Sequence, residues 1–282
     1  MRTKNIIGLA LCFCLFMIGF TLHGNIGLYF NLSGLLIVIG GSFGAALISY
    51  RFKRLQIVYK VVVSSYKRKA KDPKEIVEIL VDLAVKSKFK GIISLQKDEA
   101  EASILFLRGA LGLLVDGYSG QEIRSLLTSE MKFFQHRRET CEQVLRNIAD
   151  FFPAFGLVGS VVGLIGMLSG SGDTSTILTT VPIALTSTLY GIIFANLFFL
   201  PFAANLREKT NRELLLQKII MEGVIAIESE LNPRILENKL KSFLTPSSRH
   251  GRMVSLEKIR KRFHINQGPA SRNIPIPANE QI

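Results

Sequence analysis

The chain has 282 residues, of which 48% are hydrophobic, and its formal net charge is +13. The apolar residues lie in long uncharged blocks rather than at amphipathic spacing, which is typical of an integral membrane protein and argues against a soluble globular enzyme. The three cysteines imply no disulfide framework, and the four scattered histidines predict neither a metal site nor an enzyme.

Two uncharged regions each have the length of a helical hairpin. No charged residue lies between Lys4 and Arg51, and only two acidic residues are charged between Arg146 and Arg207. A bilayer core needs roughly 20 apolar residues per helix, so each region is long enough for two spans. The expected spans run over 5–22, 28–49, 152–169 and 179–204, with polar turns at 23–25 and 169–176.

The first apolar run has a second interpretation as a signal peptide, since Arg2 and Lys4 precede it. No small-x-small cleavage site separates it cleanly from the next apolar segment. We therefore favour a retained span that pairs with the second span as a hairpin, and an even number of spans places both termini on one side.

The basic residues lie mainly outside the spans. Basic residues follow the second span directly from Arg51 and the fourth span directly from Arg207. The two short turns contain neither Lys nor Arg. By the positive-inside rule, both termini and the large polar segments are expected in the cytoplasm. Nucleic-acid binding is the alternative use of this charge, but the basic segment 249–267 contains no binding motif, so we predict no nucleic acid partner.

No expected span contains an internal Asp, Glu, Lys, Arg or His, although proteins that move protons or sodium usually place an ionisable group inside the membrane. If this chain works with an ion gradient, a partner must supply the carboxylate. The spans do contain hydroxyl groups, on Ser160, Thr186, Ser187 and Thr188. These either bond to backbone carbonyls and neighbouring helices or line a hydrated path, and the sequence leaves both alternatives open.

The spans are rich in small residues spaced four apart, which let helix backbones approach closely in lipid. In the third span, Gly163 follows Gly159 at this spacing, and Gly166 begins a second motif. In the fourth span, Gly191 follows Ser187. These motifs predict a closely packed helix bundle.

Two helices are expected between the second and third spans. Segment 74–91 should be a short amphipathic helix that ends at Gly91. Its apolar face comprises Ile76, Ile79, Leu80 and Leu83. Ser119 and Glu122 form a capping box that begins a second helix. About thirty residues from this point make a rod of roughly 45 Å that rises into the third span.

The fourth span is expected to continue as a long helix until Asn232 and Pro233 stop it. Beyond about residue 245 the composition predicts a disordered end. The predicted fold is thus an all-α membrane protein. Its expected segments are a membrane hairpin at 1–50, a cytoplasmic helical region at 51–151, a second membrane hairpin at 152–205, a helical extension at 206–244 and a basic tail at 245–282.

Three blocks carry a family resemblance. They read "PAFGLVGSVVGLIGML", "LTSTLYGIIFANLFFLPFA" and "MEGVIAIESELNPRILENKLKSFL". In this order, and with this spacing of spans, the chain resembles the MotA/PomA family, the larger subunit of the bacterial flagellar stator. The resemblance covers roughly residues 1–244 and leaves out the tail.

The resemblance implies a component of an ion-driven motor in the bacterial inner membrane, with H+ or Na+ as coupling ion and no cofactor. In the family, several copies, five in current pictures, surround a dimer of a MotB or PomB partner. The single span of that partner carries the ion-binding aspartate, and its periplasmic domain grips peptidoglycan. Ion passage turns the ring about the partner, and the cytoplasmic segment pushes the rotor protein FliG.

The resemblance also assigns residues inside the membrane. Pro153 and Pro201 match two family prolines that couple ion flow to movement, and Ser160 and Thr188 match positions near the ion path, with Ser187 beside them. A proline removes one backbone donor and permits a kink. For Pro153, a plain helix start remains an equal alternative.

The rotor contact is expected in the stretch "VKSKFKGIISLQKDE", where the family has a functional basic residue and an acidic residue eight positions later. Lys88 retains the basic charge, whereas Gln96 stands at the acidic position. Either Asp98 and Glu99 replace the acidic contact, or this motor relies mainly on Lys88 and nearby Lys90.

The oxygen atoms of Ser160, Ser187 and Thr188 suit sodium, so we slightly favour sodium over protons as the coupling ion, although protons also travel along hydroxyl-lined paths. An ExbB/TolQ-like energiser of outer-membrane processes is the second hypothesis, and the first hairpin argues against it, because those proteins have three spans. The third hypothesis, a non-conducting membrane scaffold, would need no partner with an intramembrane aspartate.

Overall fold

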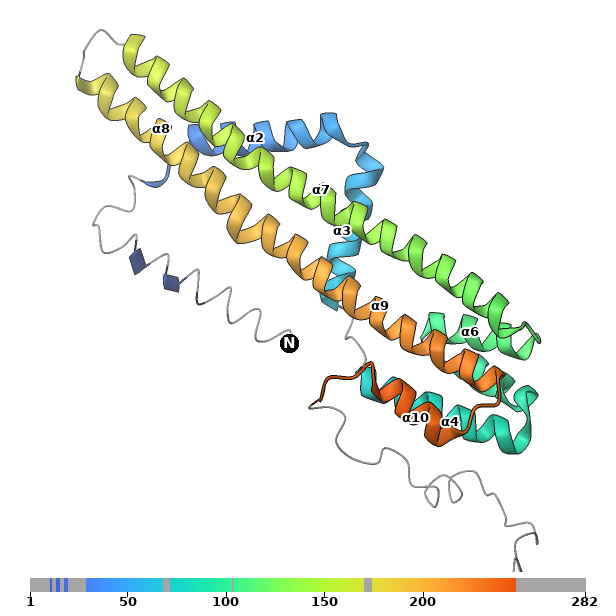
Figure 1. Cartoon of the computed structure of the whole chain (residues 1–282). Coiled ribbons are helices and arrows are strands. Elements are labelled where there is room, and N and C mark those ends of the chain that lie inside the picture. The colour runs from blue at the N-terminus through green and yellow to red at the C-terminus, as the bar shows by residue number, and fades with distance from the viewer. Residues whose placement is uncertain are drawn as a thin grey trace, which may run out of the picture. The chain divides into compact units, whose positions relative to one another are not determined.

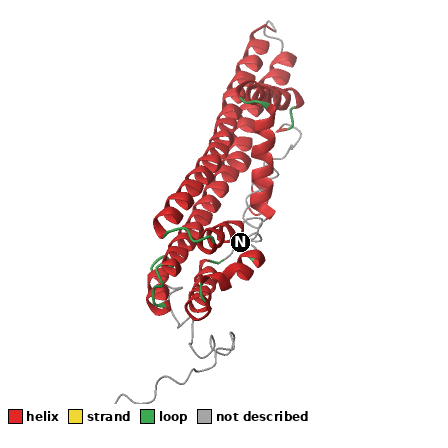
Figure 2. Ribbon diagram, turned by 90° about the vertical axis from the view of Figure 1, so that its right-hand side faces the viewer, coloured by secondary structure: helices red, strands yellow, loops and turns green. Residues whose placement is uncertain are grey.

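The computed structural model describes residues 29–67, 72–102, 104–169 and 174–246, together with five residues of the first apolar run. Within these residues every regular element is a helix (Figure 2), which confirms the all-α fold class. The elements are α2 (Leu32–Ser49), α3 (Phe52–Lys67), α4 (Pro73–Lys90), the 3-10 helix η2 (Ile92–Leu95), α5 (Gln96–Glu101), α6 (Leu105–Val115), α7 (Gly120–Ser169), α8 (Thr174–Ile193), the π-helix η3 (Phe194–Phe199), α9 (Leu200–Glu228) and α10 (Pro233–Lys241).

The chain divides into two compact units, which we describe separately. The first unit is formed by segments 1–70 and 132–213, and the second by 71–131 and 214–282. Helices α7 and α9 are long enough to contribute to both units (Figure 1). Each unit combines parts of the chain that are far apart in sequence.

The core of the first unit is built around the Phe152 side chain, which is 1% exposed. Its ring lies 4.9 Å from the ring of Phe199, 5.4 Å from that of Phe194 and 6.1 Å from that of Phe43, measured between centroids. Aromatic rings at these separations add attraction to the burial of apolar area. Phe152 therefore joins α2, α7 and the π-helix η3 beside the expected start of the third span.

The core of the second unit confirms the amphipathic helix predicted from the sequence. Ile76, Leu80 and Leu83 of α4 are buried and Ile79 packs against the same core. Gly91 ends the helix with a φ of +78°, a conformation that glycine adopts without strain. Most of the other core side chains come from α4 itself, α6, α10 and the parts of α7 and α9 that belong to this unit, and Leu95 of η2 is also fully buried there.

The capping box predicted at the start of α7 is confirmed. The Ser119 backbone N–H donates to Glu122 Oε2 at 2.9 Å, and the Glu122 backbone N–H donates to Ser119 Oγ at 3.4 Å. From this cap, α7 continues without interruption for 50 residues, through the expected third span to Ser169. The predicted rod and span are thus one helix, whose length is about 75 Å at 1.5 Å per residue.

Three helices are long and apolar enough to cross a membrane in the part of the chain that the structure describes: Leu32–Ser49, Gly120–Ser169 and Thr180–Glu228. The first covers the expected second span from Leu32 onward, and the second contains the expected third span. The third runs through α8, η3 and α9 and covers the expected fourth span from Thr180 onward. Most of the expected first span, 5–22, lies outside the described residues, as does most of the tail after 245.

Two expectations about helix ends need correction. The long helix that leaves the fourth span ends at Glu228, before Asn232 and Pro233. Glu230 adopts a φ of +52°, and the Leu231 N–H donates to the Ala226 carbonyl at 3.0 Å, which closes the helix end. Asn232 and Pro233 instead begin α10, where Asn232 Oδ1 accepts from the Arg234 N–H at 3.0 Å.

The second correction concerns Pro153. This residue lies in the interior of α7, 33 positions after its first residue, Gly120, so the alternative of a plain helix start is wrong. Because proline has no N–H, the turn before Pro153 lacks one backbone hydrogen bond, which permits a bend in the helix.

Candidate functional site

A close approach of three helices in the first unit is centred on Ser187 of α8, which is fully buried. A Cβ added to Gly159 of α7 would lie 2.5 Å from Ser187 Oγ, and a Cβ added to Gly34 of α2 would lie 2.6 Å from the same atom. Ser187 Oγ donates to the Ile183 carbonyl at 2.6 Å. Ser187 thus occupies the space that two glycines leave between three helices, and its hydroxyl group is satisfied within its own helix.

A pair of hydroxyls joins α7 to α8 one residue further along each helix. Ser160 Oγ and Thr188 Oγ1 lie 2.5 Å apart, and Ser160 Oγ is also 2.5 Å from the Ala184 carbonyl oxygen and 3.2 Å from that of Gly156. The structure therefore brings together the two residues that the resemblance places near the ion path. The same oxygens bond to backbone carbonyls, as the first of the two alternatives for these hydroxyls expects.

The other glycines of the small-residue motifs also lie at contacts between α7 and α8. A Cβ added to Gly163 would lie 2.7 Å from the Ala184 backbone N, and one added to Gly166 would lie 3.2 Å from Thr180 Cγ2. A Cβ added to Gly191 would lie 2.5 Å from the Phe152 carbonyl oxygen. Side chains cannot be accommodated at Gly163 and Gly191 without a shift of backbone. Small residues thus allow the two helices to approach along several turns.

The two prolines singled out from the sequence lie in different settings. Pro153 packs against Gly191: a Cβ added to Gly191 would lie 3.1 Å from the Pro153 Cα. Pro201 is exposed in the first turn of α9, directly after the π-helix η3. A π-helical turn inside an α-helix is frequently found at functional sites, and here it precedes a residue that cannot donate a backbone hydrogen bond.

One buried hydroxyl in the second span is not singled out by the sequence pattern. Ser42 of α2 is fully buried, and its Oγ has no hydrogen-bond partner among the residues that the structure describes. The signal in the sequence is a polar residue inside the apolar run of α2, and hydropathy averaged over the whole span hides it.

Many apolar side chains on the outer face of the third and fourth spans are exposed. On α7 they are Leu157, Val158, Val161, Val162, Leu164, Ile165 and Leu168, and on α8 they include Leu178, Leu185 and Ile192. In water such a surface would be unstable, whereas lipid chains or other apolar helices can cover it. The single chain therefore presents the surface expected of one member of a membrane assembly.

The residues expected at the rotor contact lie in the second unit, around the end of α4. Lys88, Lys90 and Gln96 are exposed. Asp98 is held by Lys86, with 2.5 Å between Lys86 Nζ and Asp98 Oδ2, and Glu99 is partly buried near Gly112. The two basic residues are thus open to a partner, while both acidic candidates already have neighbours inside the unit.

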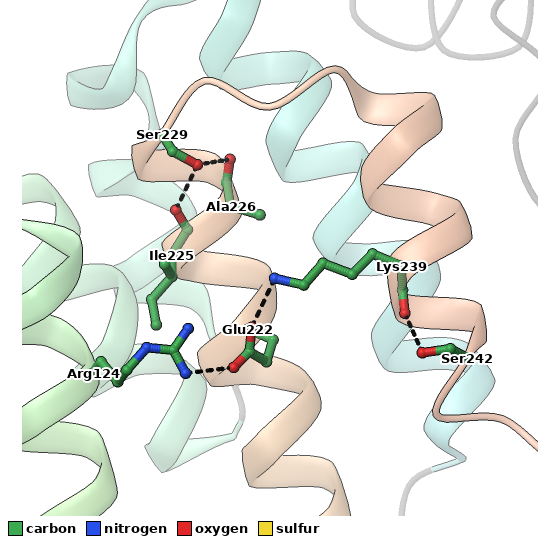
Figure 3. Close-up of polar contacts among 7 residues, drawn as sticks. All are labelled: Arg124, Glu222, Ile225, Ala226, Ser229, Lys239 and Ser242. Atoms are coloured by element: carbon green, nitrogen blue, oxygen red, sulfur yellow. Dashed lines mark hydrogen bonds and ion pairs between the residues drawn. The ribbon is translucent and has the colours of Figure 1, made fainter.

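The second unit also contains a charge cluster that sequence reasoning missed. Glu222 of α9 is 9% exposed; its Oε1 accepts from Arg124 Nη1 of α7 and its Oε2 accepts from Lys239 Nζ of α10, both at 2.7 Å (Figure 3). The Arg124 hydrogen bond, assisted by Lys239, lowers the Glu222 pKa against the opposing effect of burial. The signal in the sequence is a lone acid within the apolar run "IIMEGVIAI".

Comparison with known proteins agrees with this arrangement. Residues 97–218 match the model of the MotA/TolQ/ExbB proton channel family. The chain is 30% identical over 249 residues to the chemotaxis protein PomA of Vibrio alginolyticus, and the match covers 88% of this chain and 98% of that protein. It is 33% identical over 251 residues to motility protein A of Borreliella burgdorferi, with coverage of 88% and 96%.

Solved structures are similar over nearly the whole chain. The C. jejuni MotAB structure matches with a TM-score of 0.82 at 27% identity and covers 91% of this chain and 100% of that one. The flagellar MotAB stator complex from Bacillus subtilis matches with a TM-score of 0.81 at 26% identity, covering 87% and 98%. Given the sequence identity to PomA and motility protein A across almost their full lengths, the chain belongs to the MotA/PomA family.

Proposed function

We propose that this chain is a stator subunit of a bacterial flagellar motor and works together with a MotB- or PomB-type partner. The observation that carries the proposal is the hydroxyl pair Ser160 and Thr188, at 2.5 Å, within spans that contain no carboxylate. Ion-conducting membrane proteins usually need an ionisable group in the bilayer. A second chain with an intramembrane aspartate would complete the site, and the similarity to MotAB complexes supports such a partner.

The proposed assembly is a ring of several copies, five by analogy with the family, around a partner dimer in the inner membrane. The exposed apolar faces of α7 and α8 support it, because these faces need lipid or other helices to cover them. By the positive-inside rule, both termini and the second unit are placed in the cytoplasm, where the rotor is.

Co-purification tests the partner. The chain would be expressed with a single-span protein from the same cell that bears an intramembrane aspartate, and the complex would be assayed for motility in a strain that lacks its own stator. We expect a stable complex and restored swimming, and an Asp→Asn change in the partner should abolish swimming while the complex persists. A functional assembly that forms without any such partner would contradict the proposal and favour the scaffold hypothesis, whereas restored outer-membrane energisation would favour the ExbB/TolQ-like one.

For the rotor contact, we propose that Lys88 and Lys90 act on FliG and that Asp98 does not replace the missing acid at Gln96. Asp98 is engaged with Lys86 in the structure, whereas Lys88 and Lys90 are exposed. Lys88→Glu should reduce torque and leave ion flow intact. Lys97→Glu is the matched control, since Lys97 is an exposed lysine on the neighbouring helix α5. Equal motility of both variants would place the rotor contact elsewhere.

The coupling ion is H+ or Na+, and we propose Na+ on the basis of the hydroxyl oxygens of Ser160, Ser187 and Thr188, of which those of Ser160 and Thr188 lie 2.5 Å apart. Hard oxygen ligands suit sodium. Swimming speed measured against external sodium at fixed proton-motive force should rise and saturate. A flat response would assign the motor to protons.

A further inference from the structure

Helix α3 contains a repeat that the stator function does not explain. An aromatic residue followed by lysine occurs three times, at 52–53, 59–60 and 66–67, with a spacing of seven residues. Seven residues are close to two turns of an α-helix, so the pairs fall on nearly the same face. The repeat therefore forms a stripe of alternating ring and ammonium groups along the helix.

The first two pairs of this stripe face outward. Phe52 is 64% exposed and Tyr59 is 71% exposed, and Lys53 and Lys60 beside them are exposed as well. The opposite face of α3 is packed, since Val58 is 4% exposed and belongs to the core of the first unit. Large exposed rings on a helix whose other face is already buried indicate that something other than the described part of this chain covers them.

The position of α3 in the chain indicates what covers its exposed aromatic rings. The helix begins at Phe52, directly after the candidate membrane span α2 ends at Ser49. The connection is anchored, because Asn147 Nδ2 of α7 donates to the Tyr50 hydroxyl oxygen at 2.6 Å. With α2 as the second span, we expect the first aromatic–lysine pair within a turn of the membrane boundary, where the lipid headgroups begin.

The far end of α3 is also held in place. Lys209 of α9 donates to the Ser65 carbonyl near the end of α3, and its ammonium group lies 5.0 Å from the centroid of the Tyr66 ring. Tyr66 in turn packs edge-on against Phe202, with 5.9 Å between centroids. The Tyr66 ring thus faces the protein, whereas Phe52 and Tyr59 do not, and the exposed stripe is fixed at both ends of the helix.

We propose that the α3 stripe, Phe52, Lys53, Tyr59 and Lys60, is a binding site for acidic phospholipid headgroups of the membrane leaflet on the side of the large polar segments. Aromatic rings and lysines are enriched where protein meets headgroups, and helices with apolar rings beside a basic face lie in this interface. The lysines attract the phosphates electrostatically and the rings insert beside the acyl chains. The proposal rests on the membrane topology given above and not on the partner or the rotor contact.

The test measures lipid preference around the intact protein, purified with whatever partner it retains. The complex is reconstituted into phosphatidylcholine bilayers that contain a minor fraction of phosphatidylglycerol, and the association of spin-labelled phosphatidylglycerol is compared with that of spin-labelled phosphatidylcholine. Lys53→Gln together with Lys60→Gln should weaken the association by about 25-fold, since one lysine near an anionic surface contributes about fivefold. Arginine at both positions should retain the wild-type preference, because the charge is kept.

Matched controls separate the stripe from net charge. Lys97→Gln together with Lys218→Gln removes the same charge from two exposed lysines on other helices and should leave the preference unchanged. Phe52→Ser together with Tyr59→Ser should lower the association of both lipids. The salt dependence of phosphatidylglycerol association should remain, because it depends on the lysines.

The proposal fails if the Lys53 and Lys60 double variant keeps the full preference for phosphatidylglycerol. It also fails if that variant instead changes the number of copies in the assembly, since α3 would then be an interface between copies of this chain. Neither result bears on the stator function, which is tested by partner capture and swimming.

Discussion

The hydroxyl oxygens of Ser160 and Thr188 lie 2.5 Å apart between α7 and α8. The contact is possible because the neighbouring positions carry glycines: an added Cβ at Gly156 would be 3.2 Å from the Thr188 Cα. These two hydroxyls form a polar contact between two spans that contain no carboxylate. Both hydroxyls also bond to the backbone carbonyls of Gly156 or Ala184, so a further acceptor could be bound only by exchange of these hydrogen bonds.

Ser160→Ala and Thr188→Val each remove one side of this contact. A double-mutant cycle should give a coupling of about 0.6 kcal/mol, which is the typical value for hydrogen bonds between membrane helices, and each single variant should slow ion-driven swimming while the complex still assembles. Chemical unfolding of the four variants gives the coupling free energy, and swimming speed and complex yield measure the effect on function. Ser169→Ala at the exposed end of α7 is the control. Strictly additive effects of the two changes would show that the hydroxyls act independently.

Gly159→Ala should destabilise the helix bundle by about 1–3 kcal/mol, because the new Cβ overlaps Ser187 in a packed site. Thermal unfolding in detergent measures the effect. Gly40→Ala is the matched control, since a Cβ at Gly40 meets nothing within 4 Å in the described chain. Combining Gly159→Ala with Ser187→Gly removes the obstructing atoms and should restore part of the stability, and a lack of rescue would mean that the overlap is not the cause.

Replacing Glu222 by Gln should lower the free energy of unfolding by about 1–3 kcal/mol, because Arg124 and Lys239 then lose their charged acceptor. Glu130→Gln on the exposed face of α7 should have an effect within about 0.5 kcal/mol. Chemical unfolding of the purified protein followed by circular dichroism provides both values. If the two variants unfold with the same free energy, the charge cluster does not stabilise the protein.

The Glu222 contribution has a defined pH dependence. Because the folded state lowers the Glu222 pKa from its ordinary value of 4.5, the stabilisation is fully present above about pH 4.5 and is lost as the pH falls through the folded pKa. The melting temperatures of the wild type and of Glu222→Gln should therefore differ at neutral pH and converge in acid. A difference that stays constant down to acid pH would contradict this assignment.

Pro153→Ala should restore one backbone donor inside α7 and stiffen the helix where it contacts Gly191. We expect normal membrane insertion and partner binding but a loss of rotation, because the helix can no longer bend readily at this position while the packing surface remains. Tethered-cell rotation and complex yield are measured together. Failure of the chain to insert or accumulate would show that Pro153 has only a structural role.

Several features are predictable because they depend on residues close together in sequence. The cap at Ser119 and Glu122 joins residues three positions apart, and the end of α4 at Gly91 depends on one φ angle. The glycine spacing likewise indicates a contact surface, because residues four apart lie on one face of a helix. This spacing does not reveal the partner of each glycine, and in particular that Gly34 and Gly159 meet at Ser187.

The Glu222 cluster illustrates the opposite case. Arg124 is 98 residues from Glu222, and Lys239 is 17 residues from it in the other direction. No short-range sequence pattern indicates that these three charges interact. The sequence signal of Asn232 and Pro233 predicts the end of a helix, whereas these residues begin the helix that carries Lys239. The pairing therefore depends on the placement of α7, α9 and α10 beside one another.

The sequence by itself determined the apolar spans, the start of α7, the end of α4, the family and the absence of an intramembrane carboxylate, because hydropathy and capping act over one or a few helical turns. Only the tertiary structure decided which hydroxyl meets which carbonyl, that Lys86 engages Asp98, and that Phe52 and Tyr59 face outward while Tyr66 faces the protein. These contacts depend on how closely helices distant in sequence approach each other, and that distance is set by packing of the whole unit.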